Sequence, residues 1–176
     1  LVRALHELGH SAIQLKWPND LVHGYRKLGG VLIELQGDAM GPATAVIGVG
    51  LNLRLPEPVK NKIDQAVVDL HTLMQPAVSR NALLGSALRH LTEMLVLFEA
   101  QGFEALRAEW EQTHAYHEKP VIMRMPDGAE THGVVRGVAP DGALILDTPS
   151  GERRFGSGEM SMRPAPAYRS NKLAVD

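Results

Sequence analysis

The residue types best suited to chemistry lie in two short runs, Lys-Trp-Pro-Asn-Asp at 16–20 and Lys-Leu-Gly-Gly at 27–30. Two ammonium groups and a carboxylate around one turn suit a site that handles an anion together with a metal-bound phosphate. If His23-Gly24 forms a two-residue hairpin loop, Asp20 faces Lys27 across the strands. The pair is then either a structural ion pair or a carboxylate that holds Mg²⁺ beside an anion-binding lysine. On spacing alone the ion pair is the better interpretation, because most such pairs are structural or solvated.

The strand expected over 44–53 has one apolar face and one nearly empty face. Strand side chains alternate, so Gly48, Gly50 and Asn52 share the side opposite the apolar residues. Two glycines on one face indicate that something approaches the backbone closely. A tightly packed helix would explain this, and so would a ligand, since Asn52 offers a donor and an acceptor to an edge such as adenine.

Apolar periodicity predicts the elements that position these residues. We expect an N-terminal helix that ends near Gly9, a strand over 13–17, a hairpin over 20–35 and a long helix over 80–101. The buried stripe of the long helix should consist of Leu84, Leu88, Leu91, Leu95 and Phe98. A shorter helix should follow over 103–112.

The pattern changes from Lys119 onward. Turn signals recur at Pro126-Asp127-Gly128, Pro140-Asp141-Gly142 and Pro149-Ser150-Gly151, with short apolar runs between them. Several short strands at this spacing are typical of a small β-barrel. Residues 165–176 have no pattern and are expected to be a flexible tail.

The run His6-Glu7-Leu8-Gly9-His10 fits the zinc-protease pattern H-E-x-x-H. That pattern needs a continuous helix through both histidines, so that they share one metal. Gly9 is expected to end the helix before His10. We therefore interpret the run as the end of an amphipathic helix.

The composition excludes several classes of protein. The chain has 176 residues, a net charge of -2, 44% apolar residues and no cysteine. This argues against a general nucleic-acid surface, disulfide staples and Cys-based zinc sites, and no apolar run is long enough to span a bilayer. A cytoplasmic location without a membrane partner is the natural interpretation. Because the sequence begins Leu1-Val2-Arg3 inside an apparent helix, we expect a piece of a longer protein.

Several motifs, taken in order, resemble the bacterial biotin protein ligase family. They are KWPND at 16–20, RKLGGVLIEL at 26–35, VIGVGLNL at 46–53, Trp110-Glu111, GVAPDGALIL at 137–146 and SGEMSMR at 157–163. The resemblance covers about residues 1–164, and the ordered combination is far more specific than any one motif.

The resemblance implies an α+β fold. Residues 1–116 would be the C-terminal part of a class II synthetase-like catalytic domain, truncated at its N-terminus, with a mixed sheet and packed helices. Residues 117–164 would form an SH3-like β-barrel. The family activates biotin with ATP to biotinyl-adenylate and passes the biotinyl group to a lysine of a biotin carboxyl-carrier protein. Biotin, ATP and Mg²⁺ are thus the expected ligands.

By resemblance, Lys27 matches the family's central lysine, which contacts biotin and the adenylate phosphate. Asp20 matches a carboxylate near the metal, and both residues are expected to be catalytic. Asn52 is placed for adenine, and Arg163 matches an arginine of the small domain that reaches towards the nucleotide. The other expected binding residues are Lys16, Asn19, Gly30, Gly48 and Gly50.

Two departures from the family pattern are visible. The glycine- and arginine-rich loop G-R-G-R-R-G, which closes over biotin, is absent, and so are the N-terminal strands of the catalytic domain. Because its sheet lacks these partner strands, we expect the fragment alone to be inactive and marginally stable. Some members also cover adenine with an aromatic residue, where this chain has Ala66-Val67-Val68. Val67 can shield a ring but cannot stack on it.

Two other functions stay open. Some relatives repress transcription with biotinyl-adenylate as corepressor, and they dimerise on DNA through an upstream domain that this chain lacks. A homodimer is therefore one expected assembly. A non-catalytic ligand-binding module that keeps the fold is the weaker alternative.

Overall fold

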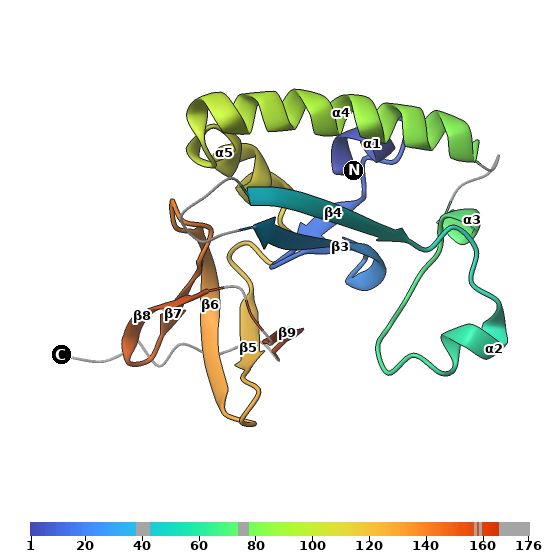
Figure 1. Cartoon of the computed structure of the whole chain (residues 1–176). Coiled ribbons are helices and arrows are strands. Elements are labelled where there is room, and N and C mark those ends of the chain that lie inside the picture. Colours follow the sequence, from blue (N-terminus) through green and yellow to red (C-terminus); the bar gives the residue numbers. More distant parts are fainter. Residues whose placement is uncertain (38–42, 74–77, 157, 159, 166–176) are drawn as a thin grey trace. The chain divides into compact units, whose positions relative to one another are not determined.

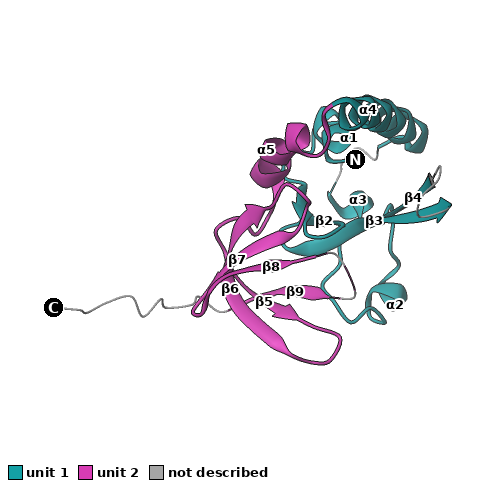
Figure 2. Ribbon diagram, turned by 60° about the vertical axis from the view of Figure 1, so that its left-hand side comes forward, with its two compact units in different colours: residues 1–100 teal, residues 101–176 magenta. Residues whose placement is uncertain are grey.

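Residues 1–37, 43–73, 78–156, 158 and 160–165 are described by the computed structural model. The chain divides into unit 1, Leu1–Ala100, and unit 2, Gln101–Asp176 (Figure 2). Apart from residue 165, the predicted tail lies outside the described residues. None of the described helices combines the length and the apolar character needed to cross a bilayer.

Unit 1 is built on a four-stranded sheet with the order β1-β2-β3-β4, in which neighbouring strands are antiparallel. A separate parallel bridge joins Lys27 to Val67 and adds the mixed character that was expected. The elements are α1 (Val2–Glu7), β1 (Gln14–Lys16), β2 (Asp20–His23), β3 (Arg26–Gly37), β4 (Ala43–Leu51), α2 (Glu57–Lys60), α3 (Leu70–Leu73) and α4 (Arg80–Gln101).

The core of unit 1 lies between the sheet and the helices. Figure 1 shows α4 running along one side of the sheet, with α1 beside it. The buried apolar residues come from both ends of the unit: Ala4, Leu5, Ile13, Leu21, Leu28, Val68, Leu70 and Leu83. Glu7 of α1 also accepts hydrogen bonds from Ser86 and Arg89 of α4. Burial of these apolar groups is the main force that holds the helices on the sheet.

The bounds predicted for α4 are confirmed, but its predicted buried stripe is wrong. Leu84, Leu88, Leu95 and Phe98 are between 43% and 57% exposed, and Leu91 is half-buried. The helix instead turns Leu83 and Ala87 towards the core. Both stripes have helical spacing, so periodicity alone could not choose between them.

The predicted hairpin is present, with its loop one residue further along the chain. Gly24 and Tyr25 form the loop, and both have positive φ, +54° and +63°. This is the geometry of a type I′ turn, which matches the twist of the flanking strands. The predicted pairing of Asp20 with Lys27 is therefore wrong: His23 pairs with Arg26, and Val22 pairs with Lys27.

Unit 2 consists of α5 and a five-stranded antiparallel sheet with the order β8-β7-β6-β5-β9. Its elements are α5 (Glu104–Thr113), β5 (Pro120–Arg124), β6 (Glu130–Val138), β7 (Leu144–Thr148), β8 (Gly151–Phe155) and β9 (Ser161–Pro164). All three predicted turns separate strands, and Gly128, Gly142 and Gly151 each have positive φ. No ladder joins β8 to β9 among the described strands, so closure into a barrel stays a prediction.

Helix α5 is fixed to β6 by one carboxylate. Glu111 accepts a hydrogen bond from the backbone N–H of Val138 at 3.1 Å. The ladder of β6 with β7 is irregular between Val135 and Gly137, and Gly137 has φ +132°. A β-carbon on Gly137 would overlap the Glu111 carboxylate. Glycine at this position therefore lets the helix approach the strand.

Candidate functional site

Asp20 lies between the two lysines of the predicted cluster. Its Oδ1 is 2.5 Å from Lys27 Nζ, and its Oδ2 is 3.4 Å from Lys16 Nζ. The Lys27 side chain is 32% exposed, whereas those of Asp20 and Lys16 are 13% and 11% exposed. Two positive groups therefore lie beside one carboxylate, and the Lys27 side chain is the most exposed of the three. Positive groups of this kind attract anions.

Lys16 pairs with Asp20 in the β1–β2 ladder, and a bulge in the β2–β3 hairpin brings Lys27 to the same carboxylate. Leu21 pairs with Gly29 and Val22 pairs with Lys27, so Leu28 is an extra residue in β3. Leu28 turns into the core and is completely buried. Bulges re-aim side chains in this way. The proximity that the sequence predicted is thus achieved without direct pairing of Asp20 with Lys27.

Gly30 leaves room beside this ion pair. A β-carbon there would lie 3.3 Å from Asp20 Oδ1 and 3.6 Å from Lys27 Cε. Asp20 pairs with Gly30 across the ladder, and Gly30 pairs with Gly50 of β4. The charged groups therefore lie on the sheet face that carries the glycines of β4.

The glycines of β4 are not required by packing within unit 1. A β-carbon on Gly48 would come no closer than 3.5 Å to the Leu32 carbonyl, and one on Gly50 no closer than 3.8 Å to the Gly30 carbonyl. Both are ordinary contacts, and both glycines are exposed. Within the described residues, the alternative of a tightly packed helix has no support. The face is free for a ligand to approach the backbone.

Asn52 directly follows β4, and its side-chain amide bonds to the backbone of two neighbouring segments. Its Nδ2 donates to the carbonyl oxygens of Lys27 at 3.3 Å and Val68 at 3.1 Å. The segment 66–68 runs beside Lys27, whose N–H donates to Ala66 O and whose carbonyl accepts from Val68 N. The Asn52 amide N–H groups therefore point at the protein backbone, and its Oδ1 is the atom left for other partners in the described part of the chain.

The remaining predicted residues lie near the cluster or in unit 2. Asn19 donates from Nδ2 to the Val31 carbonyl at 2.7 Å, which ties the turn before β2 to β3. Arg163 lies on β9 of unit 2, opposite Ile122, and donates to the carbonyl of Met162 at 3.4 Å. Its expected contact with a nucleotide stays a prediction.

The neighbours of Asp20 do not fit a magnesium site built by the protein alone. Mg²⁺ binds oxygen ligands, and the Asp20 oxygens face two ammonium groups instead. No three His, Asp or Glu side chains gather to hold a metal in the described residues.

The predicted end of the first helix is confirmed. Helix α1 stops at Glu7, and Gly9 has φ +95°. His6 Nε2 lies 2.8 Å from the carbonyl oxygen of Ile13. The helix thus ends before His10, as the sequence indicated.

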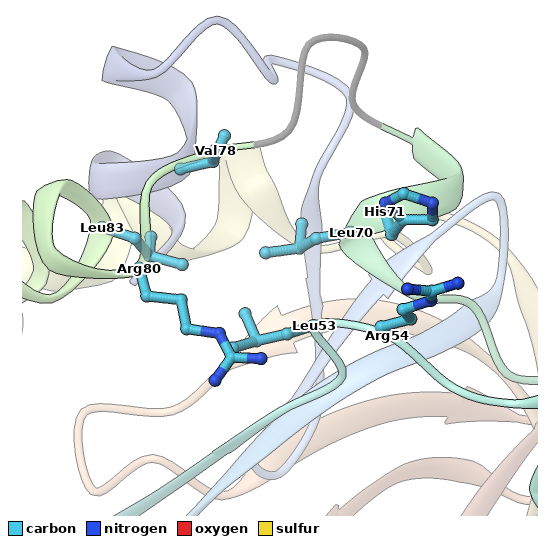
Figure 3. Close-up of a pocket in the computed structure, with 7 residues that line it drawn as sticks. All are labelled: Leu53, Arg54, Leu70, His71, Val78, Arg80 and Leu83. Atoms are coloured by element: carbon cyan, nitrogen blue, oxygen red, sulfur yellow. The ribbon is translucent and has the colours of Figure 1, made fainter.

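A hollow in unit 1 lies next to Asn52, whose carbonyl accepts a hydrogen bond from Leu70 in its wall. It has a volume of about 150 Å³ and is lined by Leu53, Arg54, Leu70, His71, Val78, Arg80 and Leu83 (Figure 3). Pockets for drug-sized ligands usually measure roughly 300–1,000 Å³. This hollow is too small for a nucleotide, and none of the predicted site residues lines it.

Two family models match the chain on either side of its middle. Residues 1–52 match the biotin/lipoate A/B protein ligase family, and residues 116–163 match the biotin protein ligase C-terminal domain. The first match contains the cluster and all of β4, and the second contains all the strands of unit 2 except the end of β9. The chain belongs to the biotin protein ligase family.

Curated biotin protein ligases match most of this chain. Bifunctional ligase/repressor BirA of Escherichia coli (strain K12) is 32% identical over 167 residues, which are 94% of this chain and 51% of that protein. The biotin--[acetyl-CoA-carboxylase] ligase of Paracoccus denitrificans is 29% identical, over 84% of this chain and 62% of its own length. The chain thus spans about half the length of the first of these relatives.

The fold is that of solved biotin protein ligases. The enzyme of Aquifex aeolicus superposes with a TM-score of 0.81 at 26% identity, covering 93% of this chain and 70% of that chain. A structure of the Aquifex aeolicus protein in complex with biotin and ATP gives a TM-score of 0.79 with the same identity and covers 67% of that chain. The predicted α+β class is confirmed.

Sequence analysis missed two parts of the site. The segment 66–68 was considered only as a cover for adenine, yet it pairs with the backbone of Lys27. Gly29 was not singled out, yet a β-carbon there would overlap the Gly50 carbonyl. The Gly29-Gly30 pair in the sequence was the available signal, because consecutive glycines in a strand often mark a bulge.

Proposed function

We propose that the whole protein activates biotin with ATP and then transfers the biotinyl group to a lysine of a biotin carboxyl-carrier protein. In the first step a biotin carboxylate oxygen bonds to the α-phosphorus of ATP, and pyrophosphate leaves. In the second, the carrier amine bonds to the acyl carbon, AMP leaves and the amine loses a proton. The observation that carries this proposal is the Lys16–Asp20–Lys27 cluster beside an open glycine face in a chain of this family.

The charges of the cluster suit the first step. A carboxylate and a triphosphate repel each other, so cations must offset the repulsion and stabilise charge at the phosphorus. In our proposal Lys27 contacts both biotin and the phosphate, because its side chain is the more exposed of the two lysines. Asp20 holds the two ammonium groups in place, and no protein nucleophile is required.

The glycine face suits the nucleotide. Gly48 and Gly50 leave the β4 backbone uncovered, and the Asn52 Oδ1 can accept from an amino group such as that of adenine. Gly30, Asn19 and Lys16 would complete this wall, Val67 would shield the ring, and Arg163 would reach the phosphates from the small domain. That domain would occupy residues 117–164, after a catalytic part at 1–116.

Mg²⁺ remains part of the proposal as a cofactor that ATP would bring. Asp20 can act as its ligand only if Lys16 or Lys27 first leaves the carboxylate, since both oxygens are paired. Biotin and ATP are bound by the Aquifex aeolicus relative, which supports these two ligands here.

The direct test uses the full-length protein. Purified protein should release pyrophosphate only when biotin and ATP are both present, and it should attach biotin to a carrier domain. A lipoate-only reaction, or no reaction with either acid, would overturn the proposal. Assays with biotin and with lipoate in parallel therefore separate the two activities that the first family model covers.

A regulatory function is the second candidate, because the Escherichia coli relative is named a bifunctional ligase/repressor. The full protein would then form a homodimer and bind DNA through a further domain, with biotinyl-adenylate as the signal. Operator binding that requires biotin and ATP would support this function. Ligation without any DNA binding would exclude the regulatory function and support the ligase activity only.

A further inference from the structure

We propose that Asn52 is a positioning residue for Lys27, and that the segment 66–68 works with it. This inference rests on the proposed function of Lys27, but it concerns how the chain holds that lysine. The Asn52 amide joins three parts of unit 1 at one point: the start of β3, the end of β4 and the segment before α3.

The β3–β4 ladder does not reach Lys27. Pairing of β3 with β4 begins at Gly29 and Leu51, two residues beyond Lys27. The bulge also breaks the pairing of β3 with β2 just after Lys27. The lysine that carries the proposed chemistry therefore lies where a sheet normally gives least support, because bulges and strand ends interrupt the hydrogen-bond ladder.

Hydrogen bonds to the segment 66–68 and to Asn52 take the place of the β3–β4 ladder at Lys27. The N–H of Lys27 donates to Ala66 O at 2.8 Å, and its carbonyl accepts from Val68 N at 2.9 Å and from Asn52 Nδ2 at 3.3 Å. The same Nδ2 donates to the Val68 carbonyl at 3.1 Å. Both polar groups of the Lys27 backbone are therefore fixed, and Asn52 bonds to both strands of this small ladder.

The Asn52 backbone is held equally firmly. Its N–H donates to Leu28 O at 2.8 Å, and its carbonyl accepts from Leu70 N at 2.8 Å. Leu28 and Leu70 belong to the buried core. The amide therefore extends from a rigid anchor to the Lys27 backbone, and this is the arrangement that keeps a reactive group in one geometry.

The position of the ammonium follows from the position of its backbone. Lys27 Nζ reaches Asp20 at 2.5 Å through a flexible four-carbon side chain. If the peptide unit shifts, the ammonium loses that partner or leaves the glycine face. Misplacement by about 1 Å can cost on the order of 100-fold in rate. Loss of the Asn52 amide should therefore slow the chemical step.

The experiment compares Asn52→Ala and Asn52→Asp in the full-length protein. The aspartate keeps the size of the side chain but replaces the donor with an acceptor that repels two carbonyls. Asn81→Asp is the matched control, because it introduces the same negative charge at an exposed position on α4. Three quantities are measured: kcat and KM for biotin-dependent pyrophosphate release, acetylation of Lys27 relative to Lys62 by mass spectrometry, and hydrogen exchange of the Val68 amide.

We expect kcat at saturating biotin and ATP to fall about 10- to 100-fold in both variants. KM for ATP should rise as well in Asn52→Ala, because that variant also lacks the Oδ1 proposed to accept from adenine. Lys27 acetylation and Val68 exchange should both rise, and Asn81→Asp should match the wild type. A raised KM for ATP with unchanged kcat would overturn the proposal and assign Asn52 to the nucleotide alone. Unchanged acetylation and exchange would also overturn it.

The failure of the proposed function is distinguishable from the failure of this inference. If the wild type releases no pyrophosphate with biotin and ATP, the function falls, and the acetylation and exchange measurements still decide the positioning role. If circular dichroism shows both Asn52 variants unfolded, the positioning role is overturned, because the amide then supports unit 1 as a whole.

Discussion

Lys27 Nζ lies 2.5 Å from Asp20 Oδ1, although the two residues are not partners in the β2–β3 ladder. The bulge at Leu28 makes this contact, since it buries one leucine and turns the preceding lysine to the glycine face. The extra residue thus both adds Leu28 to the core and places Lys27 in the charged cluster. Changes at the bulge should therefore affect both stability and activity.

Lys27→Ala should abolish biotinyl-adenylate formation by the full-length protein. Removal of one positioned donor that stabilises charge in the transition state typically lowers kcat by roughly 10²–10³-fold. Release of pyrophosphate with biotin and ATP is the measurement, and Lys62→Ala at an exposed position is the control. Adenylation near the wild-type rate would remove Lys27 from the mechanism.

Gly29→Ala should destabilise unit 1, because its β-carbon would overlap the Gly50 carbonyl and lie 3.2 Å from Leu51 Cα. Both contacts are with backbone, so β3 and β4 would have to move apart, at a cost of about 1–3 kcal/mol. Urea unfolding measures the loss. Gly48→Ala is the contrast: it should keep the free energy of unfolding but weaken ATP binding. Equal stability of the two variants would contradict this account of the bulge.

Asp69 should make the stability of unit 1 depend on pH in the acid range. Burial alone would raise the pKa of the Asp69 carboxyl, but hydrogen bonds from Thr72 and Leu55 and the Lys60 ammonium outweigh it and hold the pKa at about 2. The pKa of Asp69 in the folded protein lies below the unfolded value of 3.8. The ionised carboxylate therefore contributes fully to the free energy of unfolding above about pH 3.8, and this contribution is lost as the pH falls towards 2.

Asp69→Asn should therefore lower the free energy of unfolding at neutral pH by about 1–3 kcal/mol. The difference from the wild type should shrink as the pH falls from 4 towards 2, which urea unfolding at a series of pH values measures. A difference that does not depend on pH would show that packing, and not the charge, is what Asp69 supplies.

Gly137→Ala should loosen α5 from β6 in unit 2. The residue has φ +132°, which L side chains rarely adopt, and its β-carbon would displace the Glu111 carboxylate from the Val138 N–H. Strain of this kind costs about 1–3 kcal/mol. Thermal unfolding measures the loss. Gly156→Ala, in open space, should leave the stability within about 0.5 kcal/mol. Equal effects of the two changes would refute the account.

The strands and helix ends were predictable because local rules determine them. Apolar periodicity predicted α4 at 80–101, and the Pro and Gly signals predicted the turns that separate the strands of unit 2. The buried side of α4 was not predictable, because Leu84 and Leu88 are as apolar as Leu83. Only tertiary packing decides which of two helical stripes turns inward.

The proximity of the three charged side chains was predictable, but the strand pairing that produces it was not. Lys16, Asp20 and Lys27 were identified together by residue type, and their ion pairs are present. The bulge and the turn at Gly24-Tyr25 shift the register by small amounts that residue types do not determine. The bond from Asn52 to the Lys27 backbone joins residues 25 apart in sequence, which no local pattern records.

The bonds between Glu7 and α4 also bear on the order of events during synthesis. Glu7 meets Ser86 and Arg89, which follow it by 79 and 82 residues. Leu5 likewise packs against a core completed by Val68, Leu70 and Leu83. A nascent chain therefore lacks these partners of α1 until nearly the whole unit has left the ribosome. At roughly 5–20 residues per second, this interval lasts several seconds, and chaperones would have access to α1 throughout it.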